Sequence, residues 1–370
     1  MTMKQYRTAI LGIGVRGMTH LKGLIETGRF EIVGLCDLEL EKAKHGAEVY
    51  NLDVPCYTDA ETMLAETRPE VFVFVTPPCV RLSMVKLGQK YGVKGLSIEK
   101  PMAESLAEAK EMKDICEENG IKAVICHQQK YLSQMQEIKK RIEDGEIGDI
   151  TKIHVETQGW LAQLGTHYVD YALWANGGHK AKWVIGHVDG RATLADSHPS
   201  PDFIMGEMLL ENGARAYIEC GDLAEAHREP GYEDIDNRIT VYGTKGYVWA
   251  ETDGWWGAFT SKTNGELITG KNPGWYHHQE KVIQTPYYEE YTAWLDDDAQ
   301  VHSCNIGTAY HGYEILEGLC MSALEKTRVQ LPIQNLDYEP LMERMEKELP
   351  DVGTTLRVLY DGKKPRKEYD

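Results

Sequence analysis

The sequence lacks the features of a membrane protein or a nucleic-acid-binding protein. None of its apolar runs is long enough to cross a bilayer. Cations are scarce, because the 370 residues carry 40 Lys and Arg against 58 Asp and Glu, for a formal net charge of −18 at pH 7. This balance argues against nucleic acids and anionic membranes as partners, since both would be repelled. The length predicts about two domains with ample buried core.

Paired cysteine and histidine motifs are also missing. The eight cysteines are scattered without a C-x-x-C spacing, and most lie in apolar runs. We interpret them as reduced core residues, which favours a cytoplasmic location. No metal site is predicted, because the adjacent His277 and His278 would point to opposite faces of a strand and no third ligand follows at a telling spacing.

What the chain does contain is a glycine-rich turn near its start. A strand-like apolar run ends at Leu11, and Gly12-Ile13-Gly14-Val15-Arg16-Gly17 follows before a helical pattern with Gly28 as the expected C-cap. In such a turn the first glycine permits a tight bend, the second admits a pyrophosphate, and the third lets helix and strand pack closely. The N–H groups at the helix N-terminus would bind the phosphates.

A carboxylate follows at the spacing that a dinucleotide fold requires. The second strand-like run ends in Asp37, about 20 residues after Gly17, where the ribose hydroxyls are bound in such folds. A carboxylate there repels a 2′-phosphate, and no cation follows before Lys42. The pattern therefore predicts NAD as the cofactor in preference to NADP.

Strand-like runs alternate with helical patterns up to residue 127. The run 70–75 ends in Thr76-Pro77-Pro78, and the run 93–98 ends in Glu99-Lys100-Pro101. The alternation predicts an α/β protein whose residues 1–127 form a Rossmann domain, a doubly wound parallel sheet. Lys100, at the carboxyl end of a strand, is placed to hold a substrate hydroxyl or its alkoxide, and a surface lysine is the alternative.

The pattern changes after residue 127. Strand-like runs flank Asn212-Gly213 and Gly243-Thr244-Lys245-Gly246, which are hairpin signals, and helical patterns return over 286–295 and 306–324. Residues 128–370 are therefore predicted to form a second, α+β domain with an open, mostly antiparallel sheet.

A histidine and an aspartate begin one helix of this second domain. In Gly165-Thr166-His167-Tyr168-Val169-Asp170 the side chains of His167 and Asp170 are one helical turn apart. His167 can accept a hydroxyl proton, since the pKa of histidine is close to working pH, or it is a helix-start histidine satisfied by the backbone. Asp170 either orients His167 or packs within the domain.

These motifs resemble those of the glucose–fructose oxidoreductase, inositol dehydrogenase and MocA superfamily. The resemblance covers almost the whole chain and rests on Gly12–Gly17, Asp37, Thr76–Pro78, Glu99–Pro101, Gly145–Gly148, Gly165–Asp170 and Leu331-Pro332. It implies an NAD-dependent dehydrogenase that acts on a hydroxyl of a sugar, sugar derivative or cyclitol. It also implies that residues 128–370 bind the substrate and join subunits, as a homodimer or homotetramer formed through the sheet of this second domain.

The resemblance also implies which residues form the site. The catalytic set would be Lys100, His167, Gln163 and Asp170. The cofactor contacts would be Gly12, Ile13, Gly14, Val15, Arg16, Gly17, Asp37, Thr76, Pro77, Pro78, Glu99, Lys100 and Gln128.

The chain departs from the family pattern in two places. Gln163 replaces the Asp of the usual Asp-x-x-x-His, and Gln128-Gln129-Lys130-Tyr131 replaces an Asn-Arg-Arg-Phe-like run. Glutamine cannot act as a base, but Gln163 can hydrogen-bond a substrate hydroxyl or cap the helix.

An aromatic stretch in the second half of the chain has more than one interpretation. Its members are Trp249, Trp255, Trp256, Trp275 and Tyr276. They fit stacking on a sugar ring, cross-strand packing, or a subunit interface.

Three functions are therefore weighed. The leading one is the sugar or cyclitol dehydrogenase. The second is a glycosidase or lyase of the same fold that oxidises its substrate transiently with NAD, eliminates, and reduces it again. The third is a non-catalytic nucleotide-binding regulator, against which the presence of both Lys100 and His167 argues.

Overall fold

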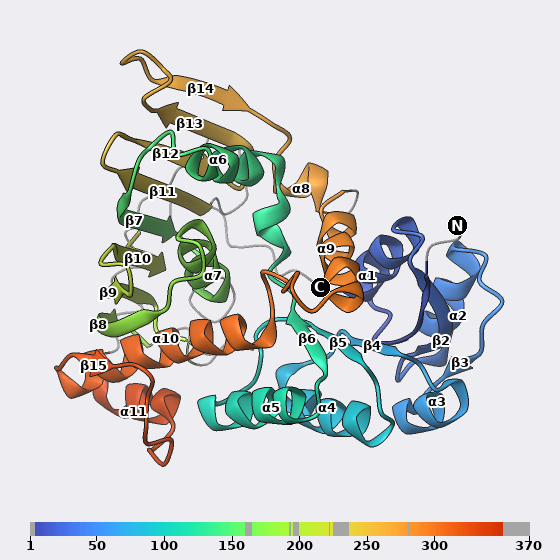
Figure 1. Ribbon diagram of the computed structural model, residues 1–370. Coiled ribbons are helices and arrows are strands. Elements are labelled where there is room, and N and C mark those ends of the chain that lie inside the picture. Colours follow the sequence, from blue (N-terminus) through green and yellow to red (C-terminus); the bar gives the residue numbers. More distant parts are fainter. Residues whose placement is uncertain are drawn as a thin grey trace, which may run out of the picture. The chain divides into compact units, whose positions relative to one another are not determined.

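The computed structural model describes residues 4–159, 165–191, 194, 200–221, 223–224, 237–279 and 282–350. The chain divides into two compact units (Figure 1). The first comprises Met1–Asp144, Thr252–Ala258 and Glu266–Tyr313, and the second comprises Gly145–Glu251, Phe259–Gly265 and Glu314–Asp370.

The first unit is built on a six-stranded sheet in which every neighbouring pair is parallel. Its strands are β1 (Tyr6–Leu11), β2 (Phe30–Cys36), β3 (Cys56–Tyr57), β4 (Val71–Phe74), β5 (Gly95–Ile98) and β6 (Lys122–Ile125). Their order, β3-β2-β1-β4-β5-β6, reverses between β1 and β4. This is the doubly wound order, so the predicted Rossmann sheet is confirmed, and its switch point lies beside the glycine turn.

Helices cover both faces of this sheet (Figure 1). Those that follow its strands are α1 (Val15–Glu26), α2 (Leu40–Val49), α3 (Ala60–Thr67), α4 (Arg81–Lys90) and α5 (Leu106–Glu118). In β4, Phe72 and Phe74 join the core under α3, α4 and α5, while Val71 and Val73 join the core under α1 and α2. The strand is buried on both faces, which explains its continuous apolar run.

One helix from late in the chain belongs to the first unit. Helix α9 (Gln284–Asp296) packs on α1. Its Tyr287, Tyr288 and Tyr291 are fully buried in the core that lies under α1 and α2. The Tyr291 hydroxyl donates to the Lys122 carbonyl at 2.7 Å, at the start of β6. The Rossmann core is therefore completed by residues that lie far beyond residue 127.

The remaining elements of this unit are shorter, and one of them contradicts an expectation from the sequence. They are η1 (Pro78–Val80), η2 (Gln128–Tyr131), α6 (Ser133–Glu143), β14 (Ile268–Lys271) and α8 (Trp275–His278). His277 and His278 lie in the helix α8, so the expectation that they alternate on a strand is wrong. The Gly274 N-cap begins this turn directly after an irregular segment, which the aromatic composition of the stretch did not reveal.

The second unit carries seven strands of a mostly antiparallel sheet. They are β7 (Ile150–Thr157), β8 (Ala181–Asp189), β9 (Phe203–Leu210), β10 (Arg215–Gly221), β11 (Asn237–Gly243), β12 (Gly246–Glu251) and β15 (Val329–Gln330). Their order is β12-β11-β7-β10-β9-β8-β15, and among these neighbours only β7 and β10 are parallel. The α+β prediction and both predicted hairpins, β9–β10 and β11–β12, are confirmed.

Two glycines let a helix approach this sheet closely. Gly186 in β8 pairs with Gly206 in β9, and α10 (Ile306–Glu325) crosses them. A Cβ atom on Gly186 would lie 2.2 Å from the main-chain oxygen of Leu319, and one on Gly206 would lie 2.3 Å from the Leu319 side chain. One face of the sheet is thus packed against α10 and α7 (Thr166–Ala175), and α11 (Leu341–Glu348) follows α10.

The other face of the sheet, formed by the alternate residues of the strands, carries aromatic and cationic side chains. Arg238 stacks 4.4 Å from the ring centre of Trp249, and Lys152 lies 4.0 Å from that of Tyr242. In the other part of the aromatic stretch, β13 (Trp255–Phe259) pairs with β14, and Lys271 stacks on its direct partner Trp255. Trp249 and Trp255 therefore pack with cations on neighbouring strands.

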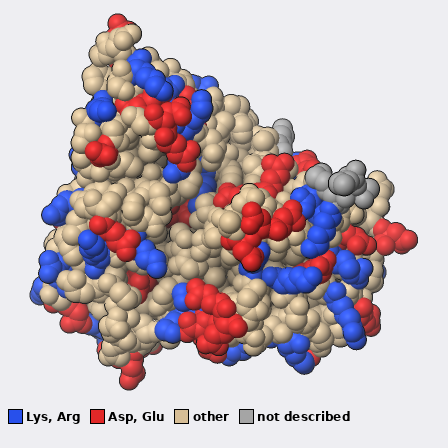
Figure 2. Space-filling view, viewed as in Figure 1, with Lys and Arg blue, Asp and Glu red and all other residues tan. Residues whose placement is uncertain are grey.

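The surface and the helices agree with the composition. Acidic and basic side chains are interspersed on the face drawn in Figure 2, without a continuous basic patch there. Within the described ranges, no helix has both the length and the apolar character needed to span a membrane. All eight cysteines are free thiols, and six of them are buried.

Candidate active site

The three glycines of the first turn have distinct steric surroundings. Gly12 has φ +88°, and a Cβ there would lie 2.2 Å from the Val75 carbonyl oxygen. A Cβ on Gly17 would lie 1.9 Å from the Gly12 oxygen, whereas nothing lies within 4 Å of the Cβ position of Gly14. The chain itself therefore requires glycine at the first and third positions, and the middle glycine borders open space.

The helix that follows has an N-terminus suited to an anion. Gly14 is the N-cap of α1 and offers no side-chain acceptor, and the first turn contains no acidic residue. The helix dipole and the N–H groups of a first turn favour a negative group at this end. Together with the space beside Gly14, these features fit the pyrophosphate of a dinucleotide.

Asp37 lies directly against the glycine turn. Its Oδ2 accepts from the Ile13 N–H at 2.7 Å, and its Oδ1 accepts from the Glu39 N–H at 3.0 Å. The nearest following cation, Lys42, pairs with Glu39 at 2.8 Å. The carboxylate is thus held at the turn by backbone donors, an arrangement that fits ribose hydroxyls and offers no cation for a 2′-phosphate.

Exposed apolar side chains follow three adjacent strands of the sheet. Val15 comes after β1 and is 78% exposed, Leu38 comes after β2 and is 89% exposed, and Val80 comes after β4 and is 37% exposed. The carboxyl ends of parallel strands meet at one edge, which is where such sheets bind ligands. Sequence reasoning included Val15 but missed Leu38 and Val80, whose signal is an apolar residue within a polar loop just after a strand.

The Glu99 carboxylate connects the glycine turn to the Glu-Lys-Pro segment. Its Oε1 accepts from Arg16 Nε at 2.6 Å and contacts His20 Nε2 at 2.9 Å, and its Oε2 accepts from the Lys100 N–H at 3.0 Å. Glu99 and His20 are both buried. Helix α9 completes the network, because Tyr288 contacts His20 Nδ1 at 2.6 Å and Gln284 accepts from Arg16 at 3.2 Å.

The charges of this network follow from its surroundings. Burial raises the pKa of Glu99, but the charge of Arg16 and the hydrogen bond with His20 outweigh burial and hold that pKa well below its ordinary value. Burial lowers the pKa of His20, so its ring is neutral. An ionised Glu99 can only accept, so His20 donates from Nε2 and accepts at Nδ1 from the Tyr288 hydroxyl.

Lys100 follows Glu99 with its backbone held from both sides. Its N–H is bound by Glu99, and its carbonyl accepts from Arg81 Nη2 at 3.3 Å. Burial lowers the pKa of the half-buried Lys100, the charge of Glu99 opposes this, and Arg16 and Arg81 lower it further. The ammonium is therefore easier to deprotonate than that of an ordinary lysine.

The other predicted cofactor contacts lie at the ends of neighbouring strands. Thr76, Pro77 and Pro78 follow β4, and the Thr76 carbonyl accepts from Arg81 Nε at 3.0 Å. Gln128 follows β6, is buried, and accepts from the Cys126 thiol at 3.4 Å. The first unit thus collects all of the predicted cofactor contacts around one sheet edge.

The other predicted catalytic residues belong to the second unit. His167 and Asp170 lie in the first turns of α7 and are both buried, and the His167 ring lies 6.3 Å from that of Tyr171. Helix α7 packs on β7, β10 and β11. Gln163 lies outside the described residues.

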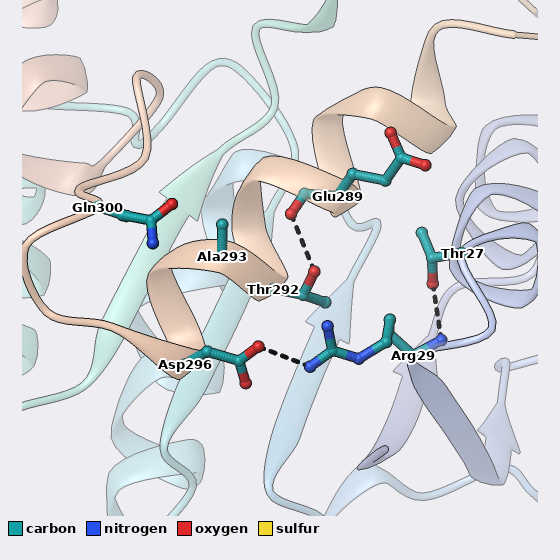
Figure 3. Close-up of a pocket in the computed structure, with 7 residues that line it drawn as sticks. All are labelled: Thr27, Arg29, Glu289, Thr292, Ala293, Asp296 and Gln300. Carbon is teal, nitrogen blue, oxygen red and sulfur yellow. Dashed lines mark hydrogen bonds and ion pairs between the residues drawn. The ribbon is translucent and has the colours of Figure 1, made fainter. Parts of the chain in front are cut away.

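A pocket in the first unit lies apart from these residues. Thr27 and Arg29, which follow α1, face Glu289, Thr292, Ala293, Asp296 and Gln300 of α9 and the segment after it (Figure 3). Arg29 is paired with Asp296 at 2.7 Å. None of the predicted site residues lines this pocket.

The sheet order, the glycine turn and Asp37 define the first unit as a dinucleotide-binding Rossmann fold. The chain belongs to the GFO/IDH/MocA oxidoreductase family, whose NAD-binding Rossmann model matches residues 6–127 and whose C-terminal domain model matches residues 156–249. The expected family and the expected cofactor, NAD, are thereby confirmed.

Two individual relatives are at most 30% identical to this chain over the residues that match. A D-apiose dehydrogenase of Paraburkholderia graminis is 30% identical over 148 residues, which is 40% of this chain and 39% of that enzyme. A 2,7-anhydro-N-acetylneuraminate hydratase of Mediterraneibacter gnavus is 29% identical over 264 residues, 66% of this chain and 67% of that enzyme. The match to the first of these relatives thus spans about two fifths of its length.

Solved structures share the fold. An oxidoreductase from Agrobacterium radiobacter, in complex with NAD+, L-tartaric acid and magnesium, superposes with a TM-score of 0.75 at 18% identity. The superposition covers 88% of this chain and 98% of that protein.

The Glu99 network generates a stability prediction. We expect Glu99→Gln to lower the free energy of unfolding at pH 7 by roughly 3–5 kcal/mol, because it leaves Arg16 without its carboxylate. Since the folded-state pKa of Glu99 is lowered, its stabilisation is complete above the unfolded pKa and is lost as pH falls through the folded pKa. The difference between wild type and variant should therefore narrow below about pH 4.3. Urea denaturation followed by circular dichroism between pH 7 and pH 3 measures it.

The matched control is Glu111→Gln, which breaks an exposed ion pair with Lys86. Its effect should stay below about 1 kcal/mol. Equal losses in the two variants would show that Glu99 contributes no more than a surface carboxylate.

Proposed function

We propose that this chain is an NAD-dependent dehydrogenase that transfers a hydride between NAD and a hydroxyl-bearing carbon of a sugar, sugar derivative or cyclitol. The observation that carries the proposal is Lys100. It lies at the carboxyl end of β5 in an NAD-binding sheet, with its peptide held by Glu99 and Arg81. The D-apiose dehydrogenase among the relatives supports a sugar as the substrate class.

The residues of the first unit fit the dinucleotide in this proposal. The turn Gly12–Gly17, with Ile13, Val15 and Arg16, would border the pyrophosphate, and Asp37 would bind the ribose hydroxyls in place of its backbone donors. The segment Thr76–Pro78, Glu99 and Gln128 would border the rest of the cofactor. Bound NAD supplies the hydride acceptor.

The remaining chemistry belongs to side chains of this protein. The Lys100 ammonium would hold the reacting oxygen and stabilise negative charge as the hydride leaves. The His167 ring would take the hydroxyl proton, with Asp170 orienting it and Gln163 hydrogen-bonding a neighbouring hydroxyl.

A second candidate reaction keeps the cofactor but makes no net NADH. It is a transient oxidation followed by elimination or addition and then reduction, as in a glycosidase or lyase. Gln163, which cannot act as a base, and the hydratase among the relatives are the observations in its favour. The dehydrogenase remains the main proposal, because Lys100 and His167 are both present.

The test is a spectrophotometric screen for NADH with free sugars, inositols and glycosides. The dehydrogenase predicts NADH in stoichiometric amounts with at least one free sugar or cyclitol. Products without NADH would instead support the second candidate. NAD binding with no turnover of any compound would favour a regulator.

Substitutions of the two proposed catalytic residues sharpen the test. Lys100→Ala should lower kcat about a hundredfold or more, the order expected for loss of a donor aimed at developing negative charge. His167→Ala should cost a similar factor and remove the limb of the pH–rate profile near neutrality. Lys94→Ala, which breaks an exposed ion pair with Glu70 just before β5, is the control and should keep full activity. An active Lys100→Ala enzyme would refute the assignment.

Cofactor preference depends on Asp37 in this proposal. The double change Asp37→Ser and Leu38→Arg should shift the preference from NAD toward NADP, because it removes the carboxylate and supplies a cation for the 2′-phosphate. Binding constants for both cofactors, measured by calorimetry, give the ratio. A wild-type protein that already prefers NADP would contradict the role of Asp37.

We also propose a cytoplasmic homodimer or homotetramer, joined through the face of the second sheet that bears Trp183, Met205 and Trp249. Met205 is 42% exposed there, and partly exposed aromatic and apolar side chains on one sheet face favour a protein partner. Free thiols at all eight cysteines support a reducing compartment. A monomeric mass by light scattering at micromolar concentration would contradict the oligomer.

A further inference from the structure

Arg81 is a buried cation that sequence reasoning left unassigned. It is the first residue of α4, and only 3% of its surface is exposed. Its Nε and Nη2 both donate to the Thr76 carbonyl, and Nη2 also donates to the Lys100 carbonyl. All three hydrogen bonds therefore go to main-chain oxygens at the carboxyl ends of β4 and β5.

The burial of Arg81 is costly for the folded protein. Among the described residues it forms no ion pair with a carboxylate, unlike Arg16, which is paired with Glu99. Its Nη1 is buried without a hydrogen-bond partner in the described structure, and so is Thr76 Oγ1. A buried charge and unpaired polar atoms oppose folding, so stability does not explain an arginine at this position.

What Arg81 accomplishes is to join two segments of the site. One segment, Thr76–Pro78, is proposed to border the cofactor, and the other contains Lys100. With Glu99 bound to the Lys100 N–H and Arg81 bound to the Lys100 carbonyl, both flanking peptide groups of the lysine are fixed by charged side chains.

We propose that Arg81 is a positioning residue for the reaction, which holds the Lys100 backbone against the Thr76 loop and so sets where the Lys100 ammonium meets the substrate oxygen. This inference rests on the proposed function. Arg81 acts through Lys100 and is not itself in contact with substrate.

The charge of Arg81 adds a second effect that an experiment can follow. Burial lowers the pKa of Lys100 most, the charges of Glu99 and Cys126 oppose this, and the charges of Arg16 and Arg81 lower it further. Loss of the Arg81 charge should therefore raise the Lys100 pKa. Because the protonated lysine is the form that stabilises negative charge, the basic limb of the pH–rate profile should then move to higher pH.

The central variant is Arg81→Met, which keeps a long side chain and removes charge and donors. We expect an unchanged or higher melting temperature, since buried ionic groups replaced by apolar ones of similar volume are often neutral or stabilising. We expect kcat to fall at least tenfold with a smaller change in KM. Arg81→Lys, which keeps the charge but bonds at a single point, should recover part of kcat and the wild-type pH profile.

A second measurement, which needs neither cofactor nor substrate, is made alongside the kinetics. The pH dependence of Lys100 acetylation, measured by peptide mass spectrometry on the unliganded protein, reports the Lys100 pKa directly. It should rise in Arg81→Met and stay near the wild-type value in Arg81→Lys. The control Lys86→Met removes the same charge from an exposed position on α4 and should change neither kcat nor the Lys100 pKa.

Each outcome decides the proposal. A kcat within twofold of wild type in Arg81→Met, with an unchanged Lys100 pKa, would overturn it. Loss of folding in Arg81→Met, with stability and activity restored together in Arg81→Lys, would show a purely structural role. If the wild type reduces no NAD with any substrate, the proposed dehydrogenase function fails by itself, and the Lys100 pKa in the variants still decides the electrostatic part of this inference.

Discussion

The buried Glu99 carboxylate is the group on which the geometry of the candidate site depends. A carboxylate removed from water is stable only with charged and hydrogen-bonding partners, and Glu99 has Arg16, His20 and the Lys100 N–H. Arg16 and His20 lie in helix α1, which begins within the glycine turn, and Lys100 follows the end of β5. The demand for neutralisation therefore sets the distance between the cofactor turn and the lysine.

Helix α9 adds a further layer of hydrogen bonds to this arrangement. The Tyr288 hydroxyl donates to Nδ1 of His20, and Gln284 bonds to Arg16, while Tyr287 and Tyr291 fill the core beneath. A stretch far along the chain thus supplies the outer layer of hydrogen bonds around residues near its beginning. The Rossmann sheet forms the edge where the predicted cofactor contacts lie, and α9 adds hydrogen bonds to polar groups near that edge.

Two kinds of buried polar group meet at this edge. Glu99, Arg16 and His20 satisfy one another, whereas Arg81 Nη1 and Thr76 Oγ1 are buried without partners in the described part of the chain. Unsatisfied groups are expected where a site is arranged for function and the rest of the fold supplies the stability. Both groups follow β4, and Arg81 also bonds to the Lys100 carbonyl, which is the physical reason to look there for residues that tune the reaction.

The sequence by itself determined the features that depend on local periodicity and on backbone sterics. Apart from the two-residue strand β3, the strands and helices of the Rossmann sheet, the two hairpins, the family and NAD all follow from patterns within a few tens of residues. The sequence could identify Gly12 and Gly17 as required turn residues, because only glycine tolerates the contacts of that turn. Local spacing also placed Asp37 at the end of β2, although its bond to the Ile13 N–H was not foreseeable.

Only the tertiary structure decided which distant residues meet. It brought α9 into the first unit, gave Glu99 its partners, and placed Arg81 against the Lys100 carbonyl. It also made a helical turn of His277 and His278, where alternation on a strand was expected. These outcomes depend on contacts between residues separated by up to 268 positions, as His20 and Tyr288 are. Local patterns carry no record of such pairs, because the free energy of burial and charge neutralisation is defined only when the chain has folded.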